Sequence, residues 1–153
     1  MAQDNRPVLI GMNNPVSSDP KHALYPYPPG CTGHRLLEML QDRVPSATRG
    51  QYLDRFDRRN LVPHKTFSAT IAAKHAAEIE QEFWGSGRTV VLLGLDVVKA
   101  FRHPRSLIHP QLIGGTTWRQ IPHPSGRNLW YNDASNRQLV AMLLEDLFNV
   151  VSA

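Results

Sequence analysis

Two polar segments, each following a short apolar run, contain residue types that could act on a nucleic acid. Residues 11–15 contain two carboxamides, Asn13 and Asn14, before a proline. Residues 123–128 read His-Pro-Ser-Gly-Arg-Asn, which places an imidazole, a hydroxyl, a glycine and a guanidinium together. A carboxamide offers donors and an acceptor in one plane, and an imidazole can donate a hydrogen bond to an oxygen that gains negative charge. The two segments form the candidate site.

Each candidate also has a plainer interpretation as part of a loop. Asn13 and Asn14 could orient a water molecule or bind a substrate, but Asn-Asn-Pro is also typical of a turn. His123 could stabilise a developing oxyanion, or it could be a loop histidine with a local hydrogen-bond partner. The functional interpretation of His123 gains weight from the residues that follow it.

The rest of the second segment suits contact with a phosphodiester backbone. Ser125 and the amide of Gly126 are suited to a phosphate oxygen. Arg127 and Asn128 could enter a groove or fill a gap in the base stack. We therefore expect these four residues to bind nucleic acid.

Apolar runs and helical spacing predict the elements that position these segments. Because continuous apolar runs, such as 8–10 and 90–93, alternate with helices, the pattern favours a parallel sheet covered on both faces. The predicted fold is α/β, a single three-layer α/β/α domain over residues 1–153 with a short four-stranded, mainly parallel sheet. The expected strands are 7–12, about 59–62, 89–94 and 118–122, and the expected helices are 34–41, 68–84 and about 134–150.

Helical spacing also predicts which side chains face the core. Each of the three helices has an apolar stripe. The predicted inward residues are Leu36, Leu37 and Leu40 in the first helix, Ala72, Ala76, Ile79 and Phe83 in the second, and Leu139, Met142, Leu143, Leu147 and Val150 in the last.

The predicted sheet would bring the two polar segments together. Ligands of parallel α/β sheets bind beyond the carboxyl ends of the strands, and residues 11–15 and 123–125 both follow strands at those ends. The coil 15–29, with five prolines and two tyrosines, is expected to cover the same edge.

Charge is consistent with a nucleic-acid partner. The chain has a formal net charge of +4, and a basic surface attracts polyanions. The basic side chains could equally lie in two solvated loops. They form one group of Arg49, Arg55, Arg58, Arg59 and Lys65, and another of Arg102, His103, Arg105, Arg119, His123 and Arg127.

Composition excludes several classes of protein. A chain of 153 residues with 41% apolar content can bury one substantial core. Its apolar runs are far shorter than the roughly 20 residues of a membrane span, so we expect a soluble intracellular protein. One cysteine cannot form an internal disulfide or hold a metal cluster. His103 and His109 precede prolines in loops, and no Gly-rich phosphate loop is present.

The two polar segments resemble the motifs of the uracil-DNA glycosylase superfamily. That superfamily has a Gly-x-Asn-Pro or Gly-x-Asp-Pro motif after the first strand and a second motif beginning His-Pro-Ser after the last. Residues 123–128 are most similar to the single-strand-selective monofunctional members, with Gly126 in place of a family proline. The first motif contains one inserted residue, so alignment from Gly11 selects Asn13 whereas alignment from Pro15 selects Asn14.

The resemblance implies an activity and further site residues. It implies a monofunctional DNA glycosylase that flips a uracil or modified pyrimidine out of DNA, works as a monomer and needs no metal or organic cofactor. Asn60 would read the Watson–Crick edge of the base, and Tyr25 or Tyr27 would stack on it. His123 would stabilise the departing base while Asn13 or Asn14 directs water at the sugar.

Two other interpretations stay open. The coil 16–29 departs from ordinary repair members, which allows an enzyme of the same fold that acts on another modified base or on a free nucleotide or nucleoside. The lack of a clear aspartate at the water position allows a nucleic-acid-binding module without catalytic activity.

Overall fold

The computed structural model describes residues 4–14, 17, 19–62 and 68–150. In this part of the chain five strands form one sheet in the order β2-β1-β3-β5-β4. The strands β2, β1, β3 and β5 are parallel, and β4 is antiparallel to β5. The α/β class and the mainly parallel sheet are confirmed, but the prediction of four strands is wrong. The strands are β1 Val8–Gly11, β2 Asp57–Asn60, β3 Thr89–Leu93, β4 Gln111–Ile113 and β5 Thr116–Ile121.

The additional strand β4 is joined to β5 by a two-residue hairpin. Ile113 pairs with Thr116, and Gly114 and Gly115 between them have φ angles of 59° and 74°. A tight type I′ turn requires positive φ at both positions, which glycine adopts without a steric penalty. The Gly-Gly pair was a recognisable hairpin signal, but a strand of three residues is too short for an alternating pattern.

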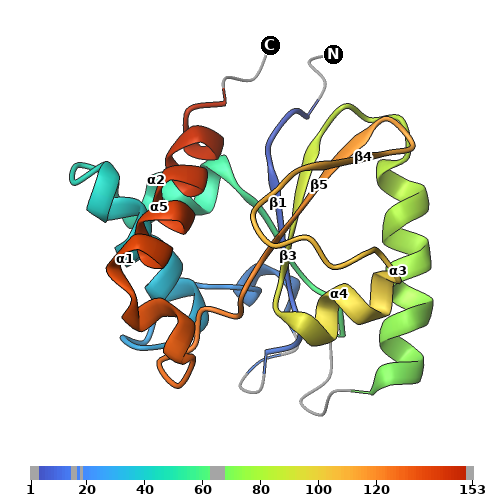
Figure 1. Cartoon of the computed structure of the whole chain (residues 1–153), viewed down its shortest axis with the longest axis horizontal. Coiled ribbons are helices and arrows are strands. Elements are labelled where there is room, and N and C mark those ends of the chain that lie inside the picture. Colours follow the sequence, from blue (N-terminus) through green and yellow to red (C-terminus); the bar gives the residue numbers. More distant parts are fainter. Residues whose placement is uncertain (1–3, 15–16, 18, 63–67, 151–153) are drawn as a thin grey trace.

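Helices cover both faces of the sheet (Figure 1). The helices α1, α2 and α5 pack on one face and α3 and α4 on the other. No helix in the described ranges combines the length and apolar character needed to cross a membrane. The sequence patterns did not predict α2 or α4, which are short. The helices are α1 Thr32–Arg43, α2 Arg49–Arg55, α3 Ala69–Phe83, α4 Leu95–Phe101 and α5 Ala134–Phe148, with 3₁₀ helices η1 Pro20–His22 and η2 Leu129–Asn132.

The strands bury side chains on both faces. Leu9 and Val91 belong to the cluster beneath α1 and α5, whereas their neighbours Val8, Ile10 and Val90 belong to the cluster beneath α3 and α4. Successive strand residues point to opposite faces, so a strand covered on both sides must be apolar at every position. This explains why the runs lack a polar alternation.

The predicted inward faces of α1 and α3 are confirmed, because all their named residues are buried. The prediction for the last helix is partly wrong. Leu139, Met142 and Val150 are 46%, 42% and 44% exposed, whereas Leu143 and Leu147 are buried. The apolar residues of α5 are too widely spread around the helix to define one face, and packing against α1 selects the face. That face includes Val140, Ala141, Leu144 and Phe148.

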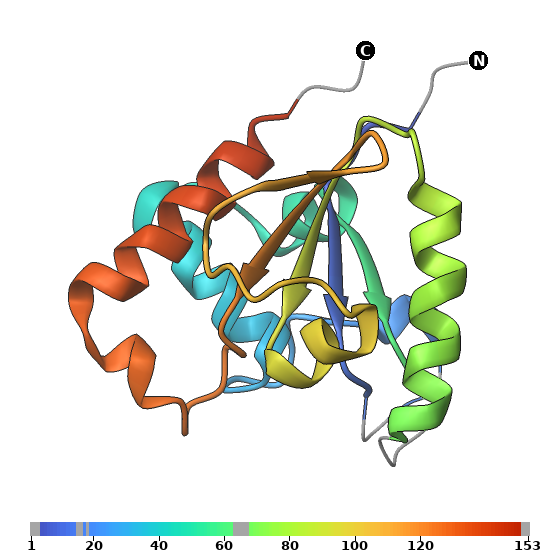
Figure 2. The same ribbon diagram turned by 45° about the vertical axis from the view of Figure 1, so that its right-hand side comes forward.

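The four parallel strands end at the same edge of the sheet (Figure 2). The strand β2 begins at Asp57, earlier than predicted, and ends at Asn60, which pairs with Gly11 at the end of β1. At the opposite edge Asp57 forms ion pairs with Arg59 and Arg88, each at 3.1 Å. These ion pairs tie the start of β2 to the residue that precedes β3.

Candidate active site at the carboxyl edge of the sheet

A cavity of about 650 Å³ lies at the carboxyl edge of the sheet. All the predicted site residues except Arg127 and Asn128 line this cavity. Segments more than a hundred residues apart in the sequence therefore meet at one place. The coil that was expected to cover this edge contributes Ser17, His22 and Tyr25 to the wall, while its residues 15, 16 and 18 lie outside the described residues. The described lining contains no Asp, Glu, Lys or Arg.

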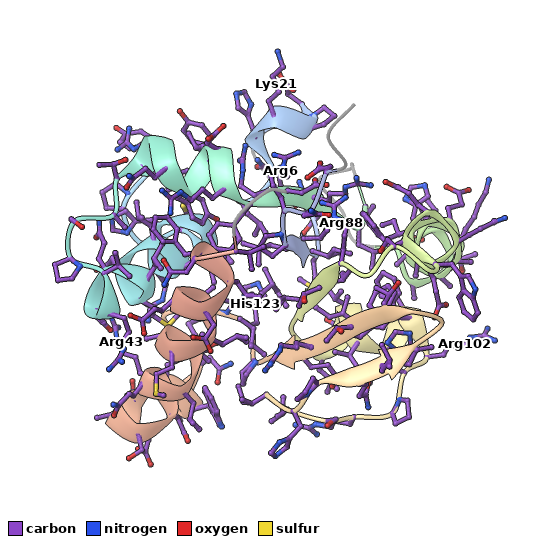
Figure 3. All side chains as sticks on the ribbon, turned by 90° about the horizontal axis from the view of Figure 1, so that it is seen from above. Arg6, Lys21, Arg43, Arg88, Arg102 and His123 are labelled. Carbon is purple, nitrogen blue, oxygen red and sulfur yellow. The ribbon has the colours of Figure 1, made fainter. Side chains whose placement is uncertain are left out.

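His123 lies just past β5 and packs against Gly94, the residue after β3; Figure 3 shows it between α5 and β5. A Cβ built on Gly94 would lie 3.1 Å from the Cβ of His123, and the φ of Gly94 is 95°. A glycine is therefore needed there. Burial lowers the pKa of the half-buried imidazole, against a smaller opposing effect of the Asp96 carboxylate. His123 is thus neutral at pH 7 and has one ring N–H to donate.

The loop 123–128 is held by its own hydrogen bonds. The Ser125 amide donates to the His123 carbonyl at 2.8 Å, and the Asn128 amide donates to the Ser125 carbonyl at 3.0 Å. The Asn128 carboxamide donates to the His123 carbonyl at 3.0 Å and accepts from Trp130 N at 3.1 Å. Asn128 thus closes the loop and caps η2, so its side chain is occupied inside the protein and does not line the cavity.

Within the loop, Ser125 and Gly126 line the cavity, whereas Arg127 is not part of the lining. Arg127 is exposed, and its backbone amide donates to Ser125 Oγ at 3.2 Å. Arg35 of α1 lies beside this loop, because its Nη1 is 3.6 Å from the position of a Cβ built on Gly126. Two guanidinium groups therefore lie near the rim of a cavity whose described wall is uncharged.

Asn13 and Asn14 both line the cavity. The Asn14 carboxamide donates to the His22 carbonyl at 3.0 Å and accepts from Ser17 N at 3.1 Å. These two hydrogen bonds tie the coil to the end of β1 and give Asn14 a structural role in the loop. Both carboxamides line the cavity, so both stay candidates for contact with a water molecule or substrate.

Asn60 and the two tyrosines lie on the wall of the same cavity. The Oδ1 of half-buried Asn60 is 3.7 Å from the position of a Cβ built on Gly11. Tyr25 is half-buried and its ring contacts His22 edge-on, with 5.8 Å between the centroids. Tyr27 is 60% exposed at the rim. Tyr25 is the more enclosed of the two candidates for stacking on a flat ligand.

Two side chains, Arg58 and Tyr52, hold the coil that forms part of the cavity wall. Arg58 Nη1 donates to the Ala23 carbonyl at 2.7 Å and to the Lys21 carbonyl at 3.2 Å. The hydroxyl of buried Tyr52 donates to the Leu24 carbonyl at 2.9 Å. Burial lowers the pKa of the Arg58 guanidinium, as expected for a cation held by neutral carbonyl groups.

Three members of the first basic group contact other parts of the protein. Arg58 holds the coil, Arg59 pairs with Asp57 and Glu82, and Arg55 donates to the Phe148 carbonyl at 3.2 Å. These three guanidinium groups therefore hold parts of the protein together. Lys65 of the same group lies outside the described residues.

Sequence patterns did not identify His22 and Ser17 as site residues. Ser17 Oγ lies 2.8 Å from His22 Nδ1, and both residues line the cavity. They belong to a coil with no hydrophobic periodicity. Their proximity to the tyrosines in sequence was the only available signal.

The described residues contain no group of three or more His, Cys, Asp or Glu side chains that could hold a metal ion. His103 instead forms an ion pair with Glu80 at 2.9 Å and packs on Trp118. Cys31, in the cavity wall, caps α1 by accepting from His34 N at 3.4 Å. No protein-family model and no curated protein matches this chain.

Proposed function

We propose that the protein is a monofunctional DNA glycosylase that hydrolyses the N-glycosidic bond of uracil or a modified pyrimidine in a flipped-out nucleotide. One observation carries the proposal. His123, Asn60 and Asn13 come from the ends of three different strands and line one cavity. On the same grounds we infer a fold of the uracil-DNA glycosylase kind.

The distribution of charge supports a nucleic-acid substrate. The described cavity lining is mostly apolar and contains several uncharged polar side chains, among them Asn13, Asn60 and Ser125, which suits the flat face and polar edge of a nucleobase. Arg35 and exposed Arg127 lie near the rim, where the phosphates on either side of a flipped nucleotide would pass.

The chemistry follows from the groups present. Water adds to the sugar carbon as the glycosidic bond breaks, and the base leaves with the bonding electron pair. The neutral imidazole of His123 donates a hydrogen bond to the base oxygen on which this charge develops. Asn13 positions the water, whose proton passes to solvent or to the departing base. The described lining has no lysine that could attack the sugar, so the proposed reaction is hydrolysis.

Incubation with labelled oligonucleotides tests the function. Single- and double-stranded DNA containing uracil, 5-hydroxymethyluracil or mismatched thymine is incubated with the protein and then cleaved with alkali at abasic sites. We expect cleavage of at least one substrate. Absence of abasic product from all of them, with the protein folded by circular dichroism, would refute the proposal.

Alanine substitutions at Asn13 and Asn14 should have different effects. Asn13→Ala is expected to lower kcat by about 100-fold, the loss typical of a misplaced reactant. Asn14→Ala removes two hydrogen bonds that hold the coil and is expected to lower the free energy of unfolding by about 1–2 kcal/mol. Single-turnover rates and thermal unfolding measure both. The reverse pattern would assign the water to Asn14.

A second candidate function is supported by the size of the cavity. At about 650 Å³ it lies within the range of sites that enclose a whole drug-sized ligand, so a free nucleoside or nucleotide would also fit. The same assay distinguishes the cases when deoxyuridine and its monophosphate are included. Faster release of base from a monomer than from any oligonucleotide would favour this function.

A further inference from the structure

A second cavity, of about 300 Å³, lies on the other side of His123. It is bounded by α4, by the connection from α4 to β4, and by the segment after β5. Its wall includes Leu95, Val98, Leu107 and Trp130. His123 is the one described residue that lines both cavities, so the two cavities meet at this residue.

The walls of the second cavity suit a flat, uncharged ring next to an anion. Leu95, Val98 and Leu107 are apolar and Trp130 is a half-buried aromatic. Arg105 is exposed and lines the same cavity, and the described lining contains no acidic residue. Aromatic surfaces on which bases stack, combined with basic groups for the backbone, are how proteins hold single-stranded nucleic acid.

The polar group inside this cavity is already occupied. Gln120 is 1% exposed, its Oε1 accepts from Ser106 N at 2.9 Å, and its Nε2 donates to the Pro104 carbonyl at 2.7 Å. The Asn128 carboxamide is likewise used within its loop. The carboxamides of Gln120 and Asn128 therefore do not select one base, and the cavity mainly offers a surface for stacking.

We propose that the second cavity binds the nucleobase adjacent to the flipped one on the same strand, with the Arg105 guanidinium on its phosphate. This inference rests on the proposed glycosylase function. Neighbouring nucleotides are about 3.4 Å apart when stacked and farther apart when unstacked, so two of them can lie on either side of one imidazole. The enzyme would unstack two consecutive bases.

Abasic analogues next to the target base test the second cavity. Single-stranded oligonucleotides carry the base released fastest by the protein, with a tetrahydrofuran residue replacing the 5′ or the 3′ neighbour. We expect kcat/KM to fall between about 5-fold and 100-fold for one of the two, the range that stacking of one base produces. Exchange of a purine for a pyrimidine neighbour should have little effect. Equal kcat/KM for both abasic analogues and the intact strand would overturn the proposal.

A variant that fills the cavity provides an independent test. Leu95 is 46% exposed, so Leu95→Trp adds a ring at the cavity without disturbing the core. It should lower kcat/KM on the intact strand to the value for the sensitive abasic analogue, and leave the value for that analogue unchanged. An equal loss on both substrates would contradict the assignment. The control is Lys74→Ala, an exposed residue of α3 that lines neither cavity, and it should change neither value.

Binding measurements separate this inference from the proposed function. Fluorescence anisotropy with the same strands compares their dissociation constants without requiring base release. If one abasic strand binds the wild type more weakly than the intact strand does, and Leu95→Trp removes this difference, the second cavity is supported even if no base is released. If base is released but the intact and abasic strands have equal dissociation constants, the proposal for the second cavity is overturned and the proposed function still stands.

Discussion

Replacement of His123 with alanine is expected to lower kcat by about 100- to 1000-fold, the loss seen when one donor to a developing oxyanion is removed. The imidazole lines the main cavity just past β5, and burial lowers its pKa. Its backbone, not its side chain, supports the loop hydrogen bonds from Ser125 and Asn128. The melting temperature should therefore change little. Single-turnover kinetics on the best substrate from the oligonucleotide panel measure the effect.

His109→Ala is the matched control for this prediction. His109 is an exposed histidine that lines neither cavity, and its replacement should leave kcat and the melting temperature unchanged. A His123→Ala variant within about 3-fold of the wild-type kcat would remove His123 from the mechanism, because even a weak donor in a site shielded from water contributes more than that.

The pH dependence of kcat/KM for the wild type should reflect the protonation of the His123 imidazole. Burial lowers the pKa of His123 below its usual value of 6.5, so the neutral form persists into mildly acidic solution. The proposed mechanism requires this form. We expect kcat/KM to stay constant as the pH falls through 6.5 and to decline only below the lowered pKa. The decline should be absent in His123→Ala and retained in His109→Ala.

The placement of the candidate site was predictable because it depends on where strands end. Val8, Leu9 and Ile10 form a run that only a strand covered on both faces would need, and His123 follows another of the predicted strands, 118–122. Once the strands are parallel, their carboxyl ends must lie at one edge. The cavity that contains Asn13, Asn60 and His123 is a consequence of this topology.

Other features depend on tertiary contacts that no local pattern records. The buried face of α5 is selected by its packing on α1, so Leu139 and Met142 are exposed despite their helical spacing. The roles of Arg58 and Asn14 depend on the path of the coil, whose carbonyl groups at Ala23 and His22 they bind. A coil without periodicity gives no indication of its path, so these hydrogen bonds could not be foreseen.

Among glycine-to-alanine replacements near the site, Gly33→Ala should lower the free energy of unfolding the most. Gly33 lies in the first turn of α1, against the coil. A Cβ there would be 2.2 Å from the Leu24 carbonyl oxygen and 2.4 Å from that of Tyr25. Backbone atoms cannot rotate away as a side chain can, so the coil must move. That movement would break the hydrogen bond from Tyr52 to Leu24 and displace Tyr25 from the cavity wall.

We expect Gly33→Ala to lower the free energy of unfolding by about 3 kcal/mol, at the upper end for overpacking, and the melting temperature by about 6–12 °C. The KM for the substrate should rise because the cavity wall shifts. Gly50→Ala is the matched control, since its Cβ would contact only Thr48 Oγ1 at 3.9 Å. That change should stabilise α2 by about 0.5–1 kcal/mol. Urea denaturation measures the free energy of unfolding of both variants. Equal changes in the two would show that the coil does not pack on α1 as described.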